Sequence, residues 1–533
     1  MADQHDSENS RVVRAAGVVG TATMLSRIFG FIRDMIVAGL FGAGLTTDAF
    51  FVAFRIPNLL RRLLAEGSLT VSFVPVFTEY LKTRSREEAL ELADIAFTAL
   101  SILLVVISLA GVLCSPLIVT VMAPGFVKSP AQYDLAVFLT RLMFPYILFI
   151  SLVALCMGIL NSLRHFAAPA LSPVVMNLAM ILAALTLRGF FREPITALAV
   201  GVMAGGVLQL AMQWPFLVRM GVRLKPNFRF RHAGLRRVGL LMLPAAFGGA
   251  IYQINIFIGT ILASLLPTGS VSYLYYADRI VELPLGVFAI AVGTATLPSF
   301  SEQVAQGRFE ELKRTISFSL RIILFITIPA TVALIVLRVP IISVLFQRGE
   351  FGVQSTLLTS QALLFYAVGL WAFSIIRIIV SAFYSLQDTK APMKAAIVAL
   401  VVNAVLSVAL MFPLRHGGIA LATSIATAVN VGMLWVILRK RIGKLLDRDF
   451  YRSLGRTFLA SLVMLGVILL IGMIYPWDTK APFDTRLIHL TLCVAVGAVA
   501  FFTAACLLKS PEITAAIGSI RRRLATRAFF SKR

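Results

Sequence analysis

The chain has 533 residues, of which 59% are hydrophobic and only 14% are charged, whereas about 25% of residues are charged in an ordinary soluble protein. This composition excludes a water-soluble enzyme of several domains. Apolar stretches of 18 or more residues recur from about residue 17 to about residue 509, and each is long enough to cross roughly 30 Å of hydrocarbon as a helix. The sequence therefore predicts an all-α polytopic membrane protein.

Fourteen transmembrane helices are predicted, joined mostly by short connections. In chain order they cover residues 17–43, 47–81, 90–121, 134–161, 169–187, 195–218, 238–266, 271–304, 311–337, 357–386, 393–412, 417–438, 455–475 and 487–508.

Lysine and arginine are distributed unevenly between the predicted loops. The loops after even-numbered helices are rich in both residue types, above all at residues 220–237 and 439–456. Residues 41–54 and 265–278 contain neither lysine nor arginine. Cytoplasmic loops carry the basic excess, so both termini are expected in the cytoplasm. This bias explains most of the formal charge of +24. Nucleic acid is not an expected partner, because no basic domain could hold a duplex.

An internal repeat emerges at an offset of 223 residues. The segment VPVFTE at 74–79 matches LPSFSE at 297–302, and SLRHFAAP at 162–169 matches SLQDTKAP at 385–392. The offset spans six predicted helices, an even number, so the two copies should share one orientation. Two six-helix lobes related by an axis along the membrane normal are expected, which is the parallel type of transporter repeat. The last two helices have no counterpart in the repeat.

These observations divide the chain into expected parts. The parts are a cytoplasmic N-terminus (1–16), an N-lobe of helices 1–6 (17–219), a basic cytoplasmic linker (220–237), a C-lobe of helices 7–12 (238–440), two extra helices (450–509) and a basic cytoplasmic tail (510–533).

Ionisable residues inside the predicted spans are the candidates for function, because each costs on the order of 2.5 to 3.5 kcal/mol at a helix centre. They concentrate in helices 1, 2 and 8. The residues are Arg27, Arg33 and Asp34 in helix 1; Asp48, Arg55, Asn58, Arg61, Arg62 and Glu66 in helix 2; and Asp278, Arg279 and Glu282 in helix 8.

Two interpretations of these charges stay open. The arginines could pair locally, Arg62 with Glu66, Arg279 with Glu282, and Arg33 or Arg27 with Asp34. Alternatively, because arginines outnumber the acids and buried pairs stabilise poorly, the guanidinium groups could face a polar cavity and bind an anion such as a diphosphate.

Features of enzymes are missing from the sequence. It contains neither a GxxxxGK[ST] loop nor an HExxH motif, and no aspartate cluster that would hold magnesium for a polyprenyl diphosphate transferase. The four cysteines lie in apolar spans without CxxC spacing and are expected to be buried packing residues. We therefore expect no catalytic residues, no metal site and no bound cofactor.

Several motifs resemble those of the MurJ (MviN) family of lipid II flippases, within the MOP transporter superfamily. They are SRIFGFIRD at 26–34, GAGLTTDAFFVAFRIPNLLRRLLAEGS at 42–68, FVPVFTEY at 73–80, APGF at 123–126, FPYI at 144–147 and YYADRIVELPLGV at 275–287. The resemblance covers nearly the whole chain. It implies fourteen helices, a central cavity, and a groove for the undecaprenyl tail at the last two helices.

The resemblance also implies roles for single residues. The family's functional arginines correspond to Arg27, Arg33, Arg61 and Arg279, and its outer acidic residue to Asp48. Some members are thought to bind sodium through acidic side chains between helices 7 and 11. The corresponding stretches here offer a candidate ion site without a carboxylate, made of Asn255, Asn403, Ser407 and Thr423.

The function implied is transport of lipid II, a polyprenyl diphosphate lipid, from the inner to the outer leaflet of the bacterial cytoplasmic membrane by alternating access, for peptidoglycan biosynthesis. Coupling to a monovalent cation or to the membrane potential is open, and proteins of cell-wall synthesis are candidate partners. The alternatives are another MOP-type polysaccharide-lipid flippase, a cation-coupled exporter, a membrane transferase and a non-transporting scaffold.

Overall fold

The structure is a computed structural model that describes residues 2–61 and 69–513. Within these residues every regular element is helical and no strand occurs. The chain forms two compact units by packing. Unit 1 comprises Met1–Ser272 with Arg348–Phe351, and unit 2 comprises Tyr273–Gln347 with Gly352–Arg533.

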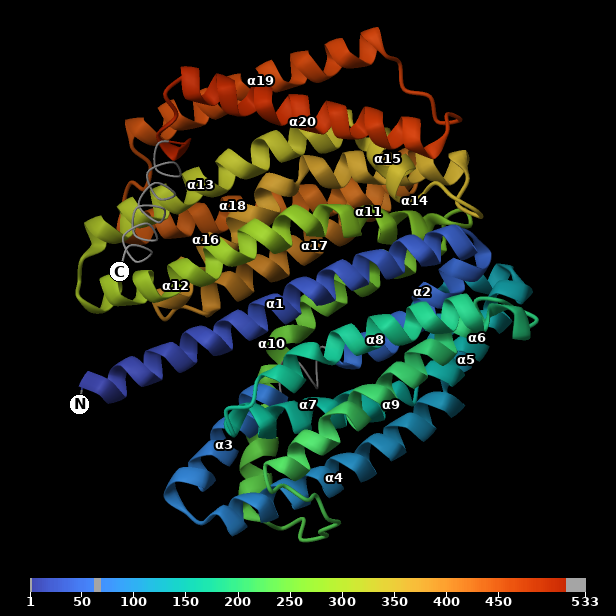
Figure 1. Cartoon of the computed structure of the whole chain (residues 1–533), viewed down its shortest axis with the longest axis vertical. Coiled ribbons are helices and arrows are strands. Elements are labelled where there is room, and N and C mark those ends of the chain that lie inside the picture. The colour runs from blue at the N-terminus through green and yellow to red at the C-terminus, as the bar shows by residue number, and fades with distance from the viewer. Residues whose placement is uncertain (1, 62–68, 514–533) are drawn as a thin grey trace, which may run out of the picture. The chain divides into compact units, whose positions relative to one another are not determined.

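Most helices of unit 1 follow one another after short connections, and a longer one, residues 220–232, joins α9 to α10 (Figure 1). They are α1 (Ala2–Phe41), α2 (Leu45–Leu60), α3 (Thr70–Thr83), α4 (Arg86–Leu113), α5 (Ser115–Met122), the 3₁₀ turn η2 (Pro124–Lys128), α6 (Pro130–Met143), α7 (Tyr146–Ser162), α8 (Ala167–Thr186), the 3₁₀ turn η3 (Arg188–Phe190), α9 (Thr196–Arg219) and α10 (Ala233–Ser264).

Unit 2 begins within α11 and ends with two long helices that lie side by side (Figure 1). Its elements are α11 (Ser270–Pro284), the π-helical turn η4 (Leu285–Ala289), α12 (Ile290–Ala305), α13 (Phe309–Val336), α14 (Arg338–Phe346), α15 (Val353–Val368), α16 (Leu370–Ser385), α17 (Lys390–Leu414), α18 (His416–Ile442), α19 (Arg448–Ile474) and α20 (Phe483–Leu507).

Several helices predicted as continuous are broken. The predicted helix 90–121 is interrupted at Cys114, because Pro116 in the first turn of α5 has no amide proton to continue the α4 ladder. The predicted helix 134–161 is interrupted for the same reason near Pro145, which precedes α7. In 357–386 the break at Gly369 bends α15 and α16 by 41°, and in 271–304 the π turn η4 intervenes.

The described residues include nine helical spans that are long and apolar enough to cross a membrane, and the bent pair α15 and α16 would add a tenth. These spans expose many large apolar side chains, as expected of a protein surrounded by lipid. Helices α1, α2 and α11, which carry the ionisable residues singled out above, are not among the nine. The chain is therefore a polytopic helical membrane protein.

Close packing between helices of unit 1 depends on small residues. Helix α9 lies against α8, and a Cβ atom added at Gly201 would lie 2.9 Å from the Cβ of Ala183. A Cβ at Gly205 would lie 2.5 Å from the sulfur of Met176. Small residues permit such close approach in membrane helices, where apolar burial alone does not drive association.

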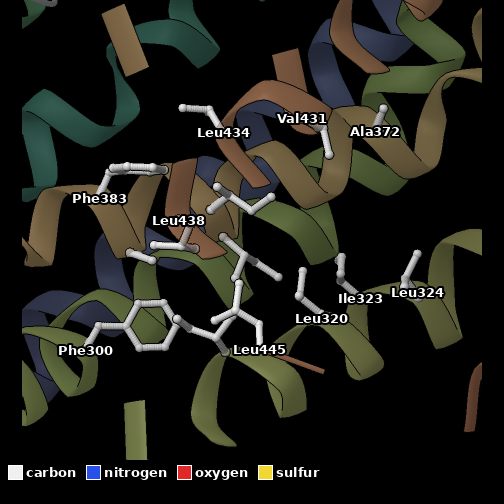
Figure 2. Packing of buried hydrophobic residues seen from close by; sticks show 14 of the residues in the cluster. Phe300, Leu320, Ile323, Leu324, Ala372, Phe383, Val431, Leu434, Leu438 and Leu445 are labelled. Carbon is white, nitrogen blue, oxygen red and sulfur yellow. The ribbon is translucent and has the colours of Figure 1, made fainter. Parts of the chain in front are cut away.

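Unit 2 has an apolar core built from α12, α13, α16 and α18 (Figure 2). Phe300 of α12 and Phe383 of α16 are fully buried within it. The cluster also includes residues of α13 and α18 and Leu445 from the connection after α18, among them Leu320, Ile323, Leu324, Val431, Leu434 and Leu438. Ala391 and Ala395 of α17 and Phe450 of α19 belong to it as well.

The element bounds of the two halves repeat in sequence. Helix α4 covers 86–113 and α13 covers 309–336, so both ends differ by 223 residues. The left-handed residues Arg164 (φ 61°) and Gln387 (φ 56°) differ by the same number. Each follows a helix that ends in the same backbone pattern, with His165 N donating to Leu160 O and Asp388 N donating to Phe383 O.

The expectation that all four cysteines are buried was wrong for two of them. Cys156 and Cys493 are buried, but Cys114 and Cys506 are exposed on the surface of the helices. A small sulfur side chain on an apolar helix face needs no protein neighbour when lipid can cover it.

Candidate functional site

Three ionisable residues of α1 lie on one helical stretch of unit 1. Arg33 donates from Nε and Nη2 to the Oδ1 atom of Asp34, at 3.1 and 2.7 Å. Both side chains are largely buried, with exposed fractions of 11% and 4%. The local pairing predicted for Asp34 is therefore formed by its neighbour Arg33.

Asn177 of α8 was not predicted as a site residue, yet it joins this cluster. Its Oδ1 accepts a hydrogen bond from Arg33 Nη1 at 3.0 Å, and its Nδ2 donates to the carbonyl of Ser26 at 3.1 Å. The Asn177 amide lies close to the backbone of Gly30, where a Cβ would be in van der Waals contact with it at 3.5 Å. The only sequence signal was a polar amide in an otherwise apolar span.

Arg27 differs from Arg33 in its surroundings. It is half-buried, and it makes no hydrogen bond or ion pair with any residue that the structure describes. Its guanidinium group can therefore accept an external anion without first breaking a pair.

Asp48 lies in the first turn of α2 and is 2% exposed. Its carboxylate accepts hydrogen bonds from the backbone amides of Gly269 and Ser272, at 2.6 and 2.8 Å, and from the Ser272 hydroxyl at 2.5 Å. All of these groups belong to unit 1. Asp48 therefore links the start of α2 to Gly269 in the connection after α10 and to Ser272 in the first turn of α11.

The other charged residues at α2 have hydrogen-bond partners that differ from those of Asp48. Arg55 donates from Nη1 to the hydroxyl of Thr260 and to the carbonyl of Ile256 on α10. Arg61, at the end of α2, donates from Nε to Oδ1 of Asn58 at 3.0 Å. Arg62 and Glu66, with their predicted pairing, lie outside the described residues.

The candidate residues of unit 2 are centred on Arg279 of α11. Its Nη1 donates to Oε2 of Glu282 at 2.7 Å, and its Nη2 donates to the hydroxyl of Tyr275 at 3.0 Å. The guanidinium carbon also lies 4.9 Å from the centre of the Tyr275 ring. The predicted pair with Glu282 is formed, while Asp278 is exposed.

The candidate ion site is divided between the two units. Asn255 belongs to unit 1 and the other three residues to unit 2. The Ser407 hydroxyl donates to Oδ1 of Asn403 at 3.3 Å, whereas the Thr423 hydroxyl donates to the Ile419 carbonyl in its own helix. Among the described residues there is no cluster of three His, Cys, Asp or Glu side chains that could bind a metal.

Unit 2 also contains an apolar groove of about 550 Å³. Its walls come mainly from α13, α19 and α20, with residues such as Phe325, Ala333, Ile468 and Phe501. Glu512, 7% exposed, lines one end, where it accepts hydrogen bonds from Ser453 and Ser510, each at 2.7 Å. Glu512 was not predicted as a site residue from the sequence.

Solved structures share this fold. An inward-facing MATE family multidrug transporter of the MOP superfamily matches with a TM-score of 0.66, covering 81% of this chain and 98% of its own at 18% identity. "Lipid II flippase MurJ, inward closed conformation" matches with a TM-score of 0.76, covering 91% and 98% at 28% identity. The chain therefore shares its fold with this MATE family transporter and with this lipid II flippase.

Comparison with sequence relatives identifies the family to which the chain belongs. The profile of the family described as "Lipid II flippase MurJ" matches residues 37–484. The "Probable lipid II flippase MurJ" of Vibrio cholerae is 35% identical over 94% of this chain and 97% of its own length. The "Lipid II flippase MurJ" of Burkholderia cenocepacia is 34% identical, over 92% and 96%. The chain belongs to the MurJ lipid II flippase family, whose members are transporters and not enzymes.

Proposed function

We propose that this chain moves lipid II, the diphosphate-linked precursor of peptidoglycan, from the inner to the outer leaflet of the bacterial inner membrane by alternating access. Family membership over residues 37–484 carries the proposal. The same finding favours lipid II over the alternatives of an exporter, a transferase or a scaffold. Labelled lipid II should lose accessibility on the outer leaflet when the protein is depleted, and unchanged accessibility would contradict the proposal.

The arginines Arg27, Arg33, Arg61 and Arg279 are the proposed contacts for the diphosphate. The planar guanidinium group of an arginine can donate two parallel hydrogen bonds to two phosphate oxygens, whereas the ammonium group of a lysine cannot bind both oxygens in this way. The absence of a described carboxylate partner at Arg27 supports an external anion there. Asp48, Asn58 and Glu282 are proposed to support this set by holding helix ends and arginine side chains.

We propose fourteen transmembrane helices in two parallel six-helix repeats with two additional helices. The offset of 223 residues, which recurs in the bounds of α4 and α13, supports the repeat. Helices α19 and α20 would be the additions, and the apolar groove beside α13 has the chemistry to receive a prenyl chain. Cell-wall synthesis proteins are proposed partners.

Both termini and the 220–237 linker are proposed to be cytoplasmic, from the distribution of basic residues. A cysteine in place of Arg231 should then be shielded from an impermeant thiol reagent in intact cells, and one in place of Thr268 should react. Both side chains are exposed. Thr268 is a better position than its neighbour Gly269, whose φ of 94° and hydrogen bond to Asp48 oppose substitution. The reverse labelling would invert this topology.

A further inference from the structure

The connection between α9 and α10 carries two exposed aromatic side chains. Phe228 and Phe230 are 67% and 45% exposed. Their rings contact each other edge to face, with centroids 6.0 Å apart. Two large apolar rings held outward on a loop are unusual on a surface that faces only water.

This connection has a defined position because α4 binds its backbone. Lys225 N donates to Oδ1 of Asp94 at 2.9 Å, and Asn227 N donates to the Thr98 hydroxyl at 2.9 Å. The Arg229 side chain pairs with Glu91 at 2.7 Å. The two phenylalanines are therefore held beside the first turns of α4.

The same stretch of α4 adjoins an apolar surface of the kind that faces lipid. From Ile102 onward α4 exposes a series of large apolar side chains: Ile102, Leu103, Val105, Val106, Leu109 and Leu113. Ile102 lies four residues beyond Thr98, which is about 6 Å along a helix axis. Asn227, which binds Thr98, therefore lies near the start of this apolar surface, whereas Arg229, between the two phenylalanines, pairs with Glu91 closer to the N-terminal end of α4.

The charge around the rings is positive. Arg223 and Arg231 are exposed and have no carboxylate within 4 Å among the described residues. The side chain of Lys225 is exposed as well. Aromatic rings and long basic side chains at one level suit the interface of an anionic membrane, where rings enter the headgroup region and cations meet lipid phosphates.

We propose that Phe228 and Phe230, with Arg223 and Arg231, form an interfacial anchor that binds anionic phospholipid headgroups and holds the connection between α9 and α10 on the membrane surface. Anionic phospholipid is favoured over a soluble protein because the exposed rings and arginines lie on a connection bound to α4, a helix that exposes an apolar surface from Ile102 onward. The anchor is independent of lipid II transport. The binding of this connection to the membrane surface therefore depends on the charge of the lipid headgroups.

The test uses the full chain with its four cysteines replaced by alanine and a fluorescent label on Phe228→Cys. The protein is reconstituted in vesicles of phosphatidylcholine, with or without phosphatidylglycerol. Quenching by iodide in water is compared with quenching by lipids that carry a spin label near the headgroup. With phosphatidylglycerol present, we expect strong quenching by lipid and protection from iodide.

Removing the positive charges of the anchor should weaken its binding to the membrane only where the lipid is anionic. Since each basic residue near such a surface contributes about 1 kcal/mol, Arg223→Gln with Arg231→Gln should shift the docked-to-free ratio by up to about 25-fold. The matched control is Arg314→Gln, which removes an exposed arginine from α13 of unit 2. It should leave quenching at position 228 unchanged.

Two outcomes would overturn the proposal. One is equal iodide access in both lipid mixtures with no effect of the double substitution. The other is protection from iodide that appears only when cytosolic protein is added, which would assign the surface to a protein partner. Because the substituted side chains are exposed, the variants should elute from gel filtration as the parent protein does, and this keeps a negative result interpretable.

Discussion

The two arginine–carboxylate pairs of the candidate site differ most in their burial. In unit 1, Arg33 and Asp34 are 11% and 4% exposed, and Asn177 occupies another donor of the guanidinium group. In unit 2, Arg279 and Glu282 are 31% and 44% exposed. A buried pair leaves an uncompensated charge when one partner is removed, whereas an accessible pair costs little to break. We therefore expect removal of Arg33 to cost more stability than removal of Arg279, although both are proposed contacts for the diphosphate.

The largest loss of stability is expected for Arg33→Ala. It removes the guanidinium group that pairs with the buried Asp34 carboxylate, which should cost about 3 to 5 kcal/mol. Protein abundance in the membrane and thermal unfolding in detergent would measure the loss. The double variant Arg33→Ala with Asp34→Ala should recover most of it, since no lone charge is left. If the double variant is as unstable as the single one, the burial argument for this pair is wrong.

A second buried carboxylate, Asp48, allows the comparison to be sharpened, because its partners carry no charge. Asp48→Ala should destabilise unit 1 by about 1 to 3 kcal/mol, since the amides of Gly269 and Ser272 lose their acceptor. Asp134→Ala is the matched control, because Asp134 is exposed. The unfolding temperatures of the two variants, measured under the same conditions, test this prediction. Equal unfolding temperatures would contradict a structural role for Asp48.

Much of the helical framework could be predicted from the sequence, because apolar length and loop charge are local signals. The breaks at Cys114 and Pro145 were missed, since two apolar helices in series form one uninterrupted apolar run. Pro116 and Pro145 were the available signals for both breaks.

The candidate site could be predicted only in part, and distance in sequence explains the difference. Arg279 and Glu282 are three residues apart on one helix, so their pairing follows from helix geometry. Arg33 and Asp34 are adjacent in sequence, so their side chains are close whatever the packing. The contact of Asn177 with Arg33 spans 144 residues, and those of Arg55 with Thr260 and Asp48 with Ser272 span more than 200. Such contacts depend on which helices pack together, which composition and periodicity do not determine.

At the accessible pair, Arg279→Ala and Glu282→Ala should each change the free energy of unfolding by less than about 1 kcal/mol. A double-mutant cycle on thermal unfolding would give their coupling energy. Transport should nevertheless fall for Arg279→Ala, because the fork offered to a diphosphate is lost, and Arg279→Lys should have an intermediate defect. A coupling energy above about 2 kcal/mol would show that Arg279 and Glu282 stabilise the protein as a buried pair does. The expected difference in stability between the pairs of the two units would then be wrong.

The smallest effect on stability is expected at Arg27, where a loss of function would be the most informative. Arg27→Ala removes a charge that costs on the order of 2.5 to 3.5 kcal/mol at a helix centre, and it leaves no described carboxylate without a partner. Abundance should therefore hold or rise while lipid II accessibility on the outer leaflet is lost. Thr23→Ala in the same helix is the control, because the Thr23 hydroxyl only donates to the carbonyl of Val19. Normal abundance together with full transport in Arg27→Ala would show that this arginine serves neither the fold nor the anion, and the proposed diphosphate contacts would then have to be sought at Arg33, Arg61 and Arg279.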